Sequence, residues 1–121
     1  MIRAWVTGLL VFALTAVGAD AQDAARGKAH FETCIVCHKL DPASSERGPS
    51  LIGIIGRRAG SLTDFRYSRA MQRADVVWSE ETLDAYLAAP QASLPGTRMP
   101  FSGIVDKTER ADVIAYLKTL R

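Results

Sequence analysis

The chain has 121 residues, of which 48% are hydrophobic, and this size predicts one ordinary domain rather than two. Its 15 Lys and Arg residues against 13 Asp and Glu residues leave a formal net charge of only +2. This modest charge, with no dense run of Lys and Arg, gives no support for nucleic-acid binding. We find no internal repeat and no low-complexity tract.

The first 21 residues are predicted to be a cleaved secretory signal peptide. A short basic start precedes an almost wholly apolar run from Ala4 to Gly18, and Ala19-Asp20-Ala21 supplies small residues at both specificity positions for cleavage. The apolar run is too short for an ordinary transmembrane helix. We therefore expect residues 22–121 to form one mature domain, exported to the periplasm without stable membrane insertion. The alternative is an uncleaved membrane anchor, and mass spectrometry of the mature N-terminus distinguishes the two.

The mature chain is predicted to open with a helix over residues 24–31, capped by Asp23. Gly27 lies in its interior, where glycine costs about 1 kcal/mol relative to alanine. This cost suggests close approach by another helix, with Phe31 as the apolar anchor one turn later. The alternative is a tolerated surface glycine.

The stretch Cys34-Ile35-Val36-Cys37-His38 places two thiols three residues apart and an imidazole directly after them. This is the attachment pattern of a covalently bound c-type haem. On a helical turn, positions three apart share a face, so both sulfurs reach the two vinyl groups of one porphyrin edge, and His38 lies where a nitrogen binds iron. Competing interpretations are a redox Cys-x-x-Cys pair, a plain disulfide and chance. The trailing histidine favours haem.

Residues 39–60 are rich in Gly, Pro and Ser and are predicted to form a long loop. A loop of this length argues against a self-sufficient fold in that region, but it is reasonable for a segment wrapped around a cofactor. Beyond it, a short helix is predicted at about Ser68 to Gln72, and residues 76–78 are predicted to be briefly extended.

Two further helices are predicted in the second half of the chain. Ser79 is expected to cap a helix that ends at Pro90. The last helix is predicted to begin at Thr108 and is the candidate to pack across Gly27. Its apolar residues repeat at helical spacing: Val113, Tyr116, Leu117 and Leu120.

The second axial position of a haem iron decides function, because an open position permits O₂ or peroxide chemistry and a filled one favours electron transfer. Met99 follows Pro95-Gly96-Thr97 in a segment that cannot be helical. Its side chain is therefore available as a ligand and is not packed on the apolar face of a helix. His30 is a weaker candidate because it shares the helix that leads into the cysteine pair. Met71 is weaker because it lies in the predicted short helix. Ordinary loop packing is the alternative for Met99.

Several long stretches together resemble class I cytochromes c, the short type shared by mitochondria and some bacteria. The resemblance implies an all-α fold with three main helices, short helices and long loops wrapped around one covalently bound haem c. The likeness extends from Gly27 to Leu120. The stretches that carry it are Cys34 to His38, Gly48-Pro49, Gly56 to Gly60, Trp78 to Leu83, Pro95 to Met99 and Thr108 to Leu117.

The resemblance implies roles for the residues around the haem iron. Cys34 and Cys37 form the thioether bonds, and His38 and Met99 are the axial ligands. The backbone carbonyl of Pro49 accepts the other imidazole proton of His38 and so fixes the orientation of the ring.

Five further residues are implied to line the haem pocket. Tyr67 and Trp78 match residues that hydrogen-bond the haem propionates, and Arg57 matches one that lies nearby. Tyr86 is expected beside the methionine ligand, and Thr97 near a propionate. From sequence spacing alone, Trp78 and Tyr67 are explained equally well as aromatic residues of the core. Arg57 is explained equally well as a solvated charge in a loop.

Two departures from the family pattern stand out. Met71 occupies a position where the family often has an asparagine in a buried polar network, so an altered potential or methionine–iron bond is expected. The family also often surrounds its exposed haem edge with lysines, whereas this chain has only four lysines, so weaker electrostatic steering is expected. Often-basic positions are occupied here by Gln91, Ala92, Val105 and Asp106.

The expected function is a mobile, exported one-electron carrier that acts as a monomer. The expected partners are a quinol:cytochrome c oxidoreductase and a terminal oxidase, with a photosynthetic reaction centre or a periplasmic dehydrogenase as replacements for one of them. An enzyme is not expected, because His30 and His38 are the only histidines and leave little acid–base chemistry. Alternatives are a gas sensor and a haem-containing electron-accepting subunit dedicated to one periplasmic dehydrogenase.

Overall fold

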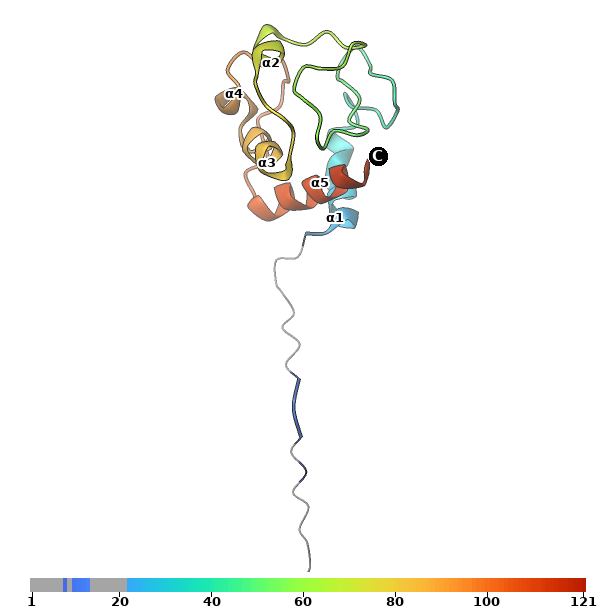
Figure 1. Ribbon diagram of the computed structural model, residues 1–121, viewed down its shortest axis with the longest axis vertical. Coiled ribbons are helices and arrows are strands. Elements are labelled where there is room, and N and C mark those ends of the chain that lie inside the picture. Colours follow the sequence, from blue (N-terminus) through green and yellow to red (C-terminus); the bar gives the residue numbers. More distant parts are fainter. Residues whose placement is uncertain (1–7, 9, 14–21) are drawn as a thin grey trace, which may run out of the picture.

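The computed structural model describes residues 8, 10–13 and 22–121. Most of the predicted signal peptide therefore lies outside the described residues. In chain order the elements are α1 (Ala24–His30), the 3₁₀ helix η1 (Phe31–Thr33), α2 (Arg69–Arg73), α3 (Glu80–Ala88), α4 (Pro90–Ser93) and α5 (Lys107–Thr119) (Figure 1). In the described part of the chain, extended pairing is limited to one isolated bridge between Arg58 and Val77. The all-α prediction is confirmed.

Side chains cap the helices much as expected, with two differences at the boundaries. Ser79 caps α3 through a reciprocal pair of hydrogen bonds with Thr82. The helix predicted to end at Pro90 ends earlier, and Pro90 instead begins α4, where its fixed φ suits the first position of a helix. Helix α5 begins one residue before the predicted Thr108, because the Asp106 carboxylate accepts a hydrogen bond from the Glu109 amide at 2.8 Å.

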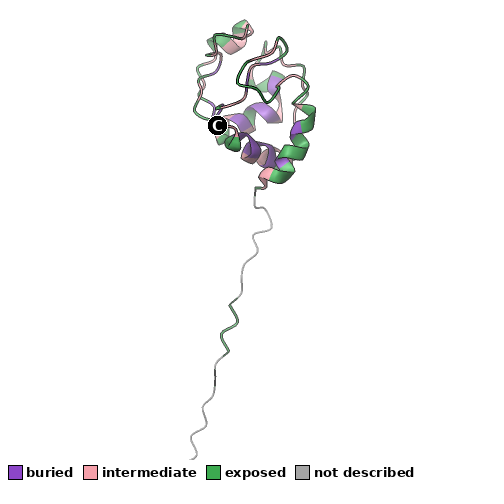
Figure 2. Cartoon of the chain, turned by 90° about the vertical axis from the view of Figure 1, so that its right-hand side faces the viewer, coloured by how far each residue is buried: buried purple, intermediate pink, exposed green. Residues whose placement is uncertain are grey.

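Helices α1 and α5 cross in close contact at Gly27, as predicted. A Cβ atom at Gly27 would clash with the Asp112 carbonyl oxygen and lie 3.0 Å from the Tyr116 Cβ, so only glycine fits. One turn later, the rings of Phe31 and Tyr116 pack with their centroids 5.2 Å apart. Figure 2 shows that the buried residues concentrate on the helices, whereas the loops are largely half-buried or exposed.

Asp112 adds hydrogen bonds to the same helix crossing. It is only 2% exposed, and its carboxylate accepts hydrogen bonds from the Asp23 amide at 2.8 Å and the Arg26 Nε at 2.9 Å. The hydrogen bond from Arg26 holds the pKa of Asp112 below its ordinary value. The carboxylate thereby ties the N-terminus of α1 to the middle of α5.

Replacing Asp112 with asparagine is expected to lower the free energy of unfolding at pH 7 and to have a smaller effect at pH 3. Because the folded pKa is depressed, the stabilisation is complete above the unfolded pKa of about 3.9 and is lost as pH falls through the folded pKa. Guanidinium unfolding of the holoprotein across this range measures the difference. Asp75→Asn is the control, because the Asp75 side chain is 88% exposed and pairs with Arg58 at the surface. Equal losses in the free energy of unfolding at pH 7 and pH 3 for Asp112→Asn would contradict a depressed pKa for Asp112.

The segments between the helices form the other half of the molecule. The long connection from Cys34 to Ser68 contains no α-helix and forms the loops beside α2 in Figure 1. Of the helices in the described part, none combines the length and hydropathy needed to cross a bilayer.

Candidate haem-binding site

The cysteine pair lies on a closed turn that continues directly from α1 and η1. The amides of Cys37 and His38 both donate to the carbonyl of Cys34, at 3.1 and 2.9 Å. Both cysteines are half-buried and free, so no disulfide joins them. Burial raises the pKa of the Cys34 thiol. The turn therefore places both cysteine side chains at the edge of the core, directly before His38.

The imidazole of His38 is held by the loop that follows the turn. Its Nδ1 lies 2.8 Å from the Pro49 carbonyl oxygen, and because a carbonyl only accepts, Nδ1 carries the proton. This tautomer leaves the Nε2 lone pair available for a metal. Burial lowers the pKa of His38, which favours the neutral ring.

Gly48 is needed for this arrangement. A Cβ atom there would lie 2.9 Å from the imidazole Nδ1 of His38 and 2.9 Å from the Cys37 carbonyl oxygen. The Ser45 hydroxyl donates to the same carbonyl at 2.9 Å, which ties the loop back onto the cysteine turn. The role of Ser45 was not predicted, because side chain–backbone bonds in a loop leave no periodic signal.

Met99 lies in a second cluster that α3 and α4 position. The Tyr86 hydroxyl lies 3.6 Å from the Met99 sulfur and 2.7 Å from the Thr97 hydroxyl oxygen. The Gln91 side-chain amide donates to the Met99 carbonyl at 2.7 Å. Burial raises the pKa of Tyr86, so its proton is retained at neutral pH. The contact of Gln91 was not predicted, nor was the helix α4 that carries it.

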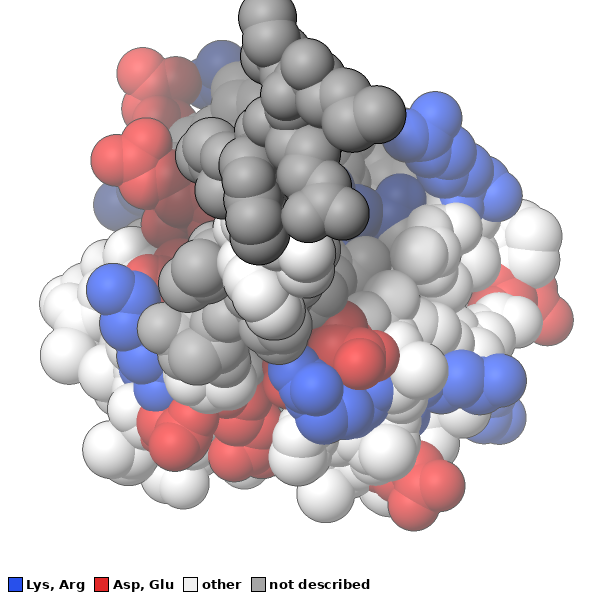
Figure 3. All heavy atoms as spheres, turned by 90° about the horizontal axis from the view of Figure 1, so that it is seen from below, with Lys and Arg blue, Asp and Glu red and all other residues white. Residues whose placement is uncertain are grey.

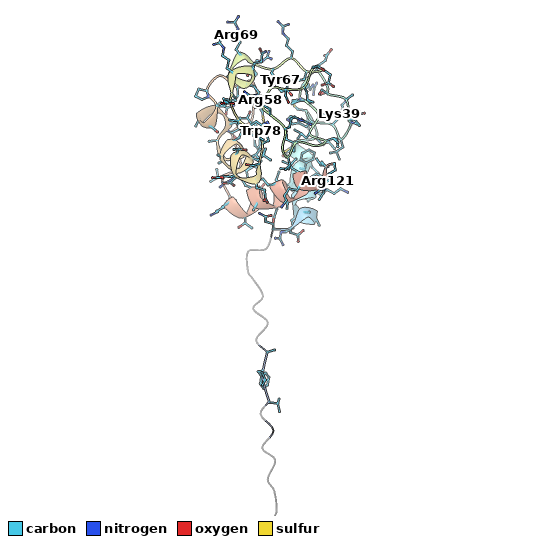
Figure 4. All side chains as sticks on the ribbon, in the orientation of Figure 1. Lys39, Arg58, Tyr67, Arg69, Trp78 and Arg121 are labelled. Carbon is cyan, nitrogen blue, oxygen red and sulfur yellow. The ribbon has the colours of Figure 1, made fainter. Side chains whose placement is uncertain are left out.

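The remaining predicted pocket residues fall into two groups. Trp78 is buried and packs against Tyr86 with ring centroids 5.2 Å apart, which joins it to the Met99 cluster. Arg57 donates to the carbonyls of Ser50 and Ile52, both at 2.5 Å, and so braces the long loop. Tyr67 is half-buried, and burial raises its pKa. Figure 4 places Trp78 below Tyr67, between α3 and the loops.

These residues suit a covalently bound haem. The donor set combines two thiols on one turn, an imidazole with its second nitrogen committed, and a thioether held in an extended loop. Apolar side chains from separate elements are packed against the core but only half-buried, which suits the flat apolar faces of a porphyrin. They include Leu51, Met71, Leu94 and Phe101.

Comparison with known proteins identifies the family. The family model for cytochrome c matches residues 24–121. The chain belongs to the cytochrome c family. Proteins of this family carry one covalently bound haem c with its iron and are electron carriers rather than enzymes. Membership favours the haem interpretation of the cysteine pair over the redox, disulfide and chance alternatives.

Individual relatives agree with this assignment to the cytochrome c family. The chain is 41% identical to cytochrome c2 of Blastochloris viridis over 118 residues, which cover 97% of this chain and 93% of that protein. It is 42% identical to cytochrome c of Euglena viridis over 100 residues, covering 82% and 98% of the two chains. The solved structure of cytochrome cH from Methylobacterium extorquens has a TM-score of 0.76 and 38% identity, covering 80% of this chain and 98% of that one. The predicted class I cytochrome c fold is confirmed.

Proposed function

We propose that this cytochrome c is an exported one-electron carrier whose haem is attached to Cys34 and Cys37 and ligated by His38 and Met99. When bound, the haem supplies an Fe(III)/Fe(II) couple. The observation that carries the proposal is the fixed thioether: the Met99 sulfur lies 3.6 Å from the Tyr86 hydroxyl in a loop that cannot be helical. A thioether presented in this way suits reduced iron and favours a high potential.

The side chains around each proposed ligand favour electron transfer with little rearrangement. Pro49 fixes the orientation of the His38 ring, and Gly48 allows the loop to approach it. Tyr86 and Gln91 hold the Met99 segment at its sulfur and at its carbonyl. Because both ligands are anchored by neighbouring hydrogen bonds, a change of one electron need not move either of them.

We propose further that residues 1–21 are removed as a signal peptide and that residues 22–121 act in the periplasm. The family match begins at residue 24, which agrees with a mature domain that starts nearby. The proposed donor is a quinol:cytochrome c oxidoreductase and the proposed acceptor a terminal oxidase. A photosynthetic reaction centre or a periplasmic dehydrogenase is the replacement for either one.

Optical spectroscopy of the holoprotein tests the ligation. The oxidised protein is expected to show the near-infrared methionine–iron band, and the reduced protein is expected not to bind carbon monoxide at neutral pH. Ready binding of carbon monoxide would contradict a closed methionine site. Stopped-flow oxidation by an isolated terminal oxidase then tests the carrier role, and absence of exchange with either membrane complex would argue for a dedicated subunit.

Replacing Met71 with asparagine is expected to shift the alkaline midpoint at which the near-infrared band disappears. Met71 is half-buried and packed against the core, so an amide there adds a hydrogen-bonding group close to the proposed pocket. One new hydrogen bond is worth about 1 kcal/mol, which corresponds to a shift of somewhat under one pH unit. Titration of the parent and the variant measures the shift, and identical midpoints and potentials would refute the effect.

A further inference from the structure

The proposed methionine ligand lies in the middle of a loop that connects α4 to α5. We define residues 94–106 as the Met99 loop. Its first half is held by the Tyr86 hydroxyl, which contacts Thr97 and Met99, and by the Gln91 side chain, which donates to the Met99 carbonyl. A loop fixed only there could swing away from the core by its other half, and its sulfur would move with it.

The second half of the Met99 loop packs against the end of α3. The Ile104 amide donates to the Leu87 carbonyl at 2.8 Å, and the Ile104 side chain is buried. A Cβ atom at Gly103 would clash with the Ala88 carbonyl oxygen, so the loop backbone passes directly over the end of the helix. The next side chain, Val105, is 92% exposed. The loop therefore leaves the core directly after Ile104, where polar contacts must hold its backbone.

Arg110 supplies polar contacts at this point. Its Nη1 donates to the carbonyls of Ile104 and Val105, at 2.9 and 3.0 Å. Its Nε donates to the Asp84 carboxylate at 2.8 Å. The guanidinium group is a planar fork of donors, which suits several acceptors at once. One side chain therefore joins α5, which carries Arg110, to α3, which carries Asp84, and to the second half of the Met99 loop.

Arg110 is more buried than the basic residues of the other described ion pairs. Its side chain is 12% exposed, whereas those of Arg26, Arg58 and Lys118 are 54%, 64% and 45% exposed. Figure 3 views the end of the molecule that carries α1 and α5, where acidic and basic side chains are interspersed over the visible described atoms. Solvent and salt screen such surface charges, but they screen a largely buried guanidinium less. Loss of Arg110 should therefore have a larger effect than loss of an exposed partner.

We propose that Arg110 is a positioning residue for the methionine ligand, because it anchors the second half of the Met99 loop through two backbone carbonyls. The loop is then fixed on both sides of the sulfur, by Tyr86 and Gln91 on one side and by Arg110 on the other. Local opening that withdraws the sulfur from the iron must break one of these anchors. This inference rests on the proposed function, in which Met99 binds the iron, and adds a residue that limits the loss of that ligand.

Imidazole binding to the oxidised holoprotein tests this role. Added imidazole reaches the iron only after the Met99 sulfur has left it, so the binding rate at saturating imidazole reports opening of the Met99 loop. Arg110→Gln is expected to bind imidazole roughly tenfold faster than the parent, because two hydrogen bonds from a charged donor are lost. Arg110→Lys keeps the charge, but its single ammonium group does not reproduce the planar fork, so binding about threefold faster is expected.

Lys118→Gln is the matched control. Lys118 also joins α5 to α3, through Glu80 at 2.9 Å, but this bond lies outside the Met99 loop, so less than a twofold acceleration of imidazole binding is expected. Guanidinium unfolding of each variant, followed by far-ultraviolet circular dichroism, measures global stability alongside. Parental binding rates in both Arg110 variants would overturn the proposal. Equal acceleration in Arg110→Gln and Lys118→Gln, or acceleration that only follows the loss of global stability, would also overturn it.

Hydrogen exchange at the Ile104 amide separates this inference from the proposed function. That amide lies beside the Arg110 contacts, so its exchange is expected to be about tenfold faster in Arg110→Gln, whichever residue binds the iron. Parental protection of the Ile104 amide in Arg110→Gln would overturn the anchoring role. A parent protein without the near-infrared methionine–iron band would instead refute the proposed ligation, whatever the exchange at Ile104 shows.

Discussion

Replacing Met99 with alanine is expected to abolish the near-infrared methionine–iron band and to lower the reduction potential by on the order of 0.2 V, within the roughly 0.8 V range that axial ligands span. The thioether is a soft ligand that stabilises reduced iron, and alanine offers no replacement. Carbon monoxide binding to the reduced variant is expected to become ready at neutral pH. Redox titration and optical spectra of the variant holoprotein measure these effects.

Met71→Leu is the matched control for this experiment, because Met71 is the other methionine of the predicted mature domain. Leucine keeps the apolar contacts of a half-buried side chain, so the near-infrared band and the potential should stay close to those of the parent. A band that persists in Met99→Ala, or one that disappears in Met71→Leu, would show that the ligand has been assigned to the wrong methionine.

Replacing Gly27 with alanine is expected to destabilise the protein by about 3 kcal/mol or more, within the upper range for overpacked sites. Helix propensity alone predicts the opposite sign, a gain of about 1 kcal/mol. The clash with the Asp112 carbonyl dominates, because backbone atoms cannot move aside as a flexible side chain can. Guanidinium unfolding and the yield of holoprotein measure the loss.

Gly53→Ala provides the comparison for Gly27→Ala. Gly53 has a φ of 74°, and a Cβ atom added there would meet no other atom within 4 Å, so alanine encounters backbone strain but no steric obstacle. A loss of about 1 kcal/mol is expected for this strain. Unchanged or increased stability for Gly27→Ala would mean that α1 and α5 separate easily, contrary to the packing described above.

Local signals in the sequence were sufficient to predict much of the helical framework. Asp23 and Ser79 cap helices as predicted, because a cap depends on residues within one turn. The close crossing at Gly27 was also predicted, since a glycine inside a helix needs a compensating contact. The cysteine motif was informative for the same local reason, because its two thiols and imidazole are adjacent in the chain.

The hydrogen bonds that stabilise the site and the helix crossing could not be predicted, because they join residues that are distant in sequence or lie in irregular segments. Asp112 accepts a hydrogen bond from the amide of Asp23, 89 positions away, and nothing in its own helix signals this partner. Gln91 reaches the Met99 carbonyl only because Pro90 starts a short extra helix. The position of Arg57 near the haem propionates stays a prediction, and its hydrogen bonds to two loop carbonyls had no signal in the sequence.

The contact between α1 and α5 also constrains when the domain can form. Its two helices lie at opposite ends of residues 22–121, and closing a loop of about 85 residues costs on the order of 4 kcal/mol of chain entropy. With the proposed export, N-terminus first, α1 would remain without its partner until the last helix has emerged. We therefore expect the cysteine turn directly after α1 to remain accessible for haem attachment during that interval, before α5 packs onto α1.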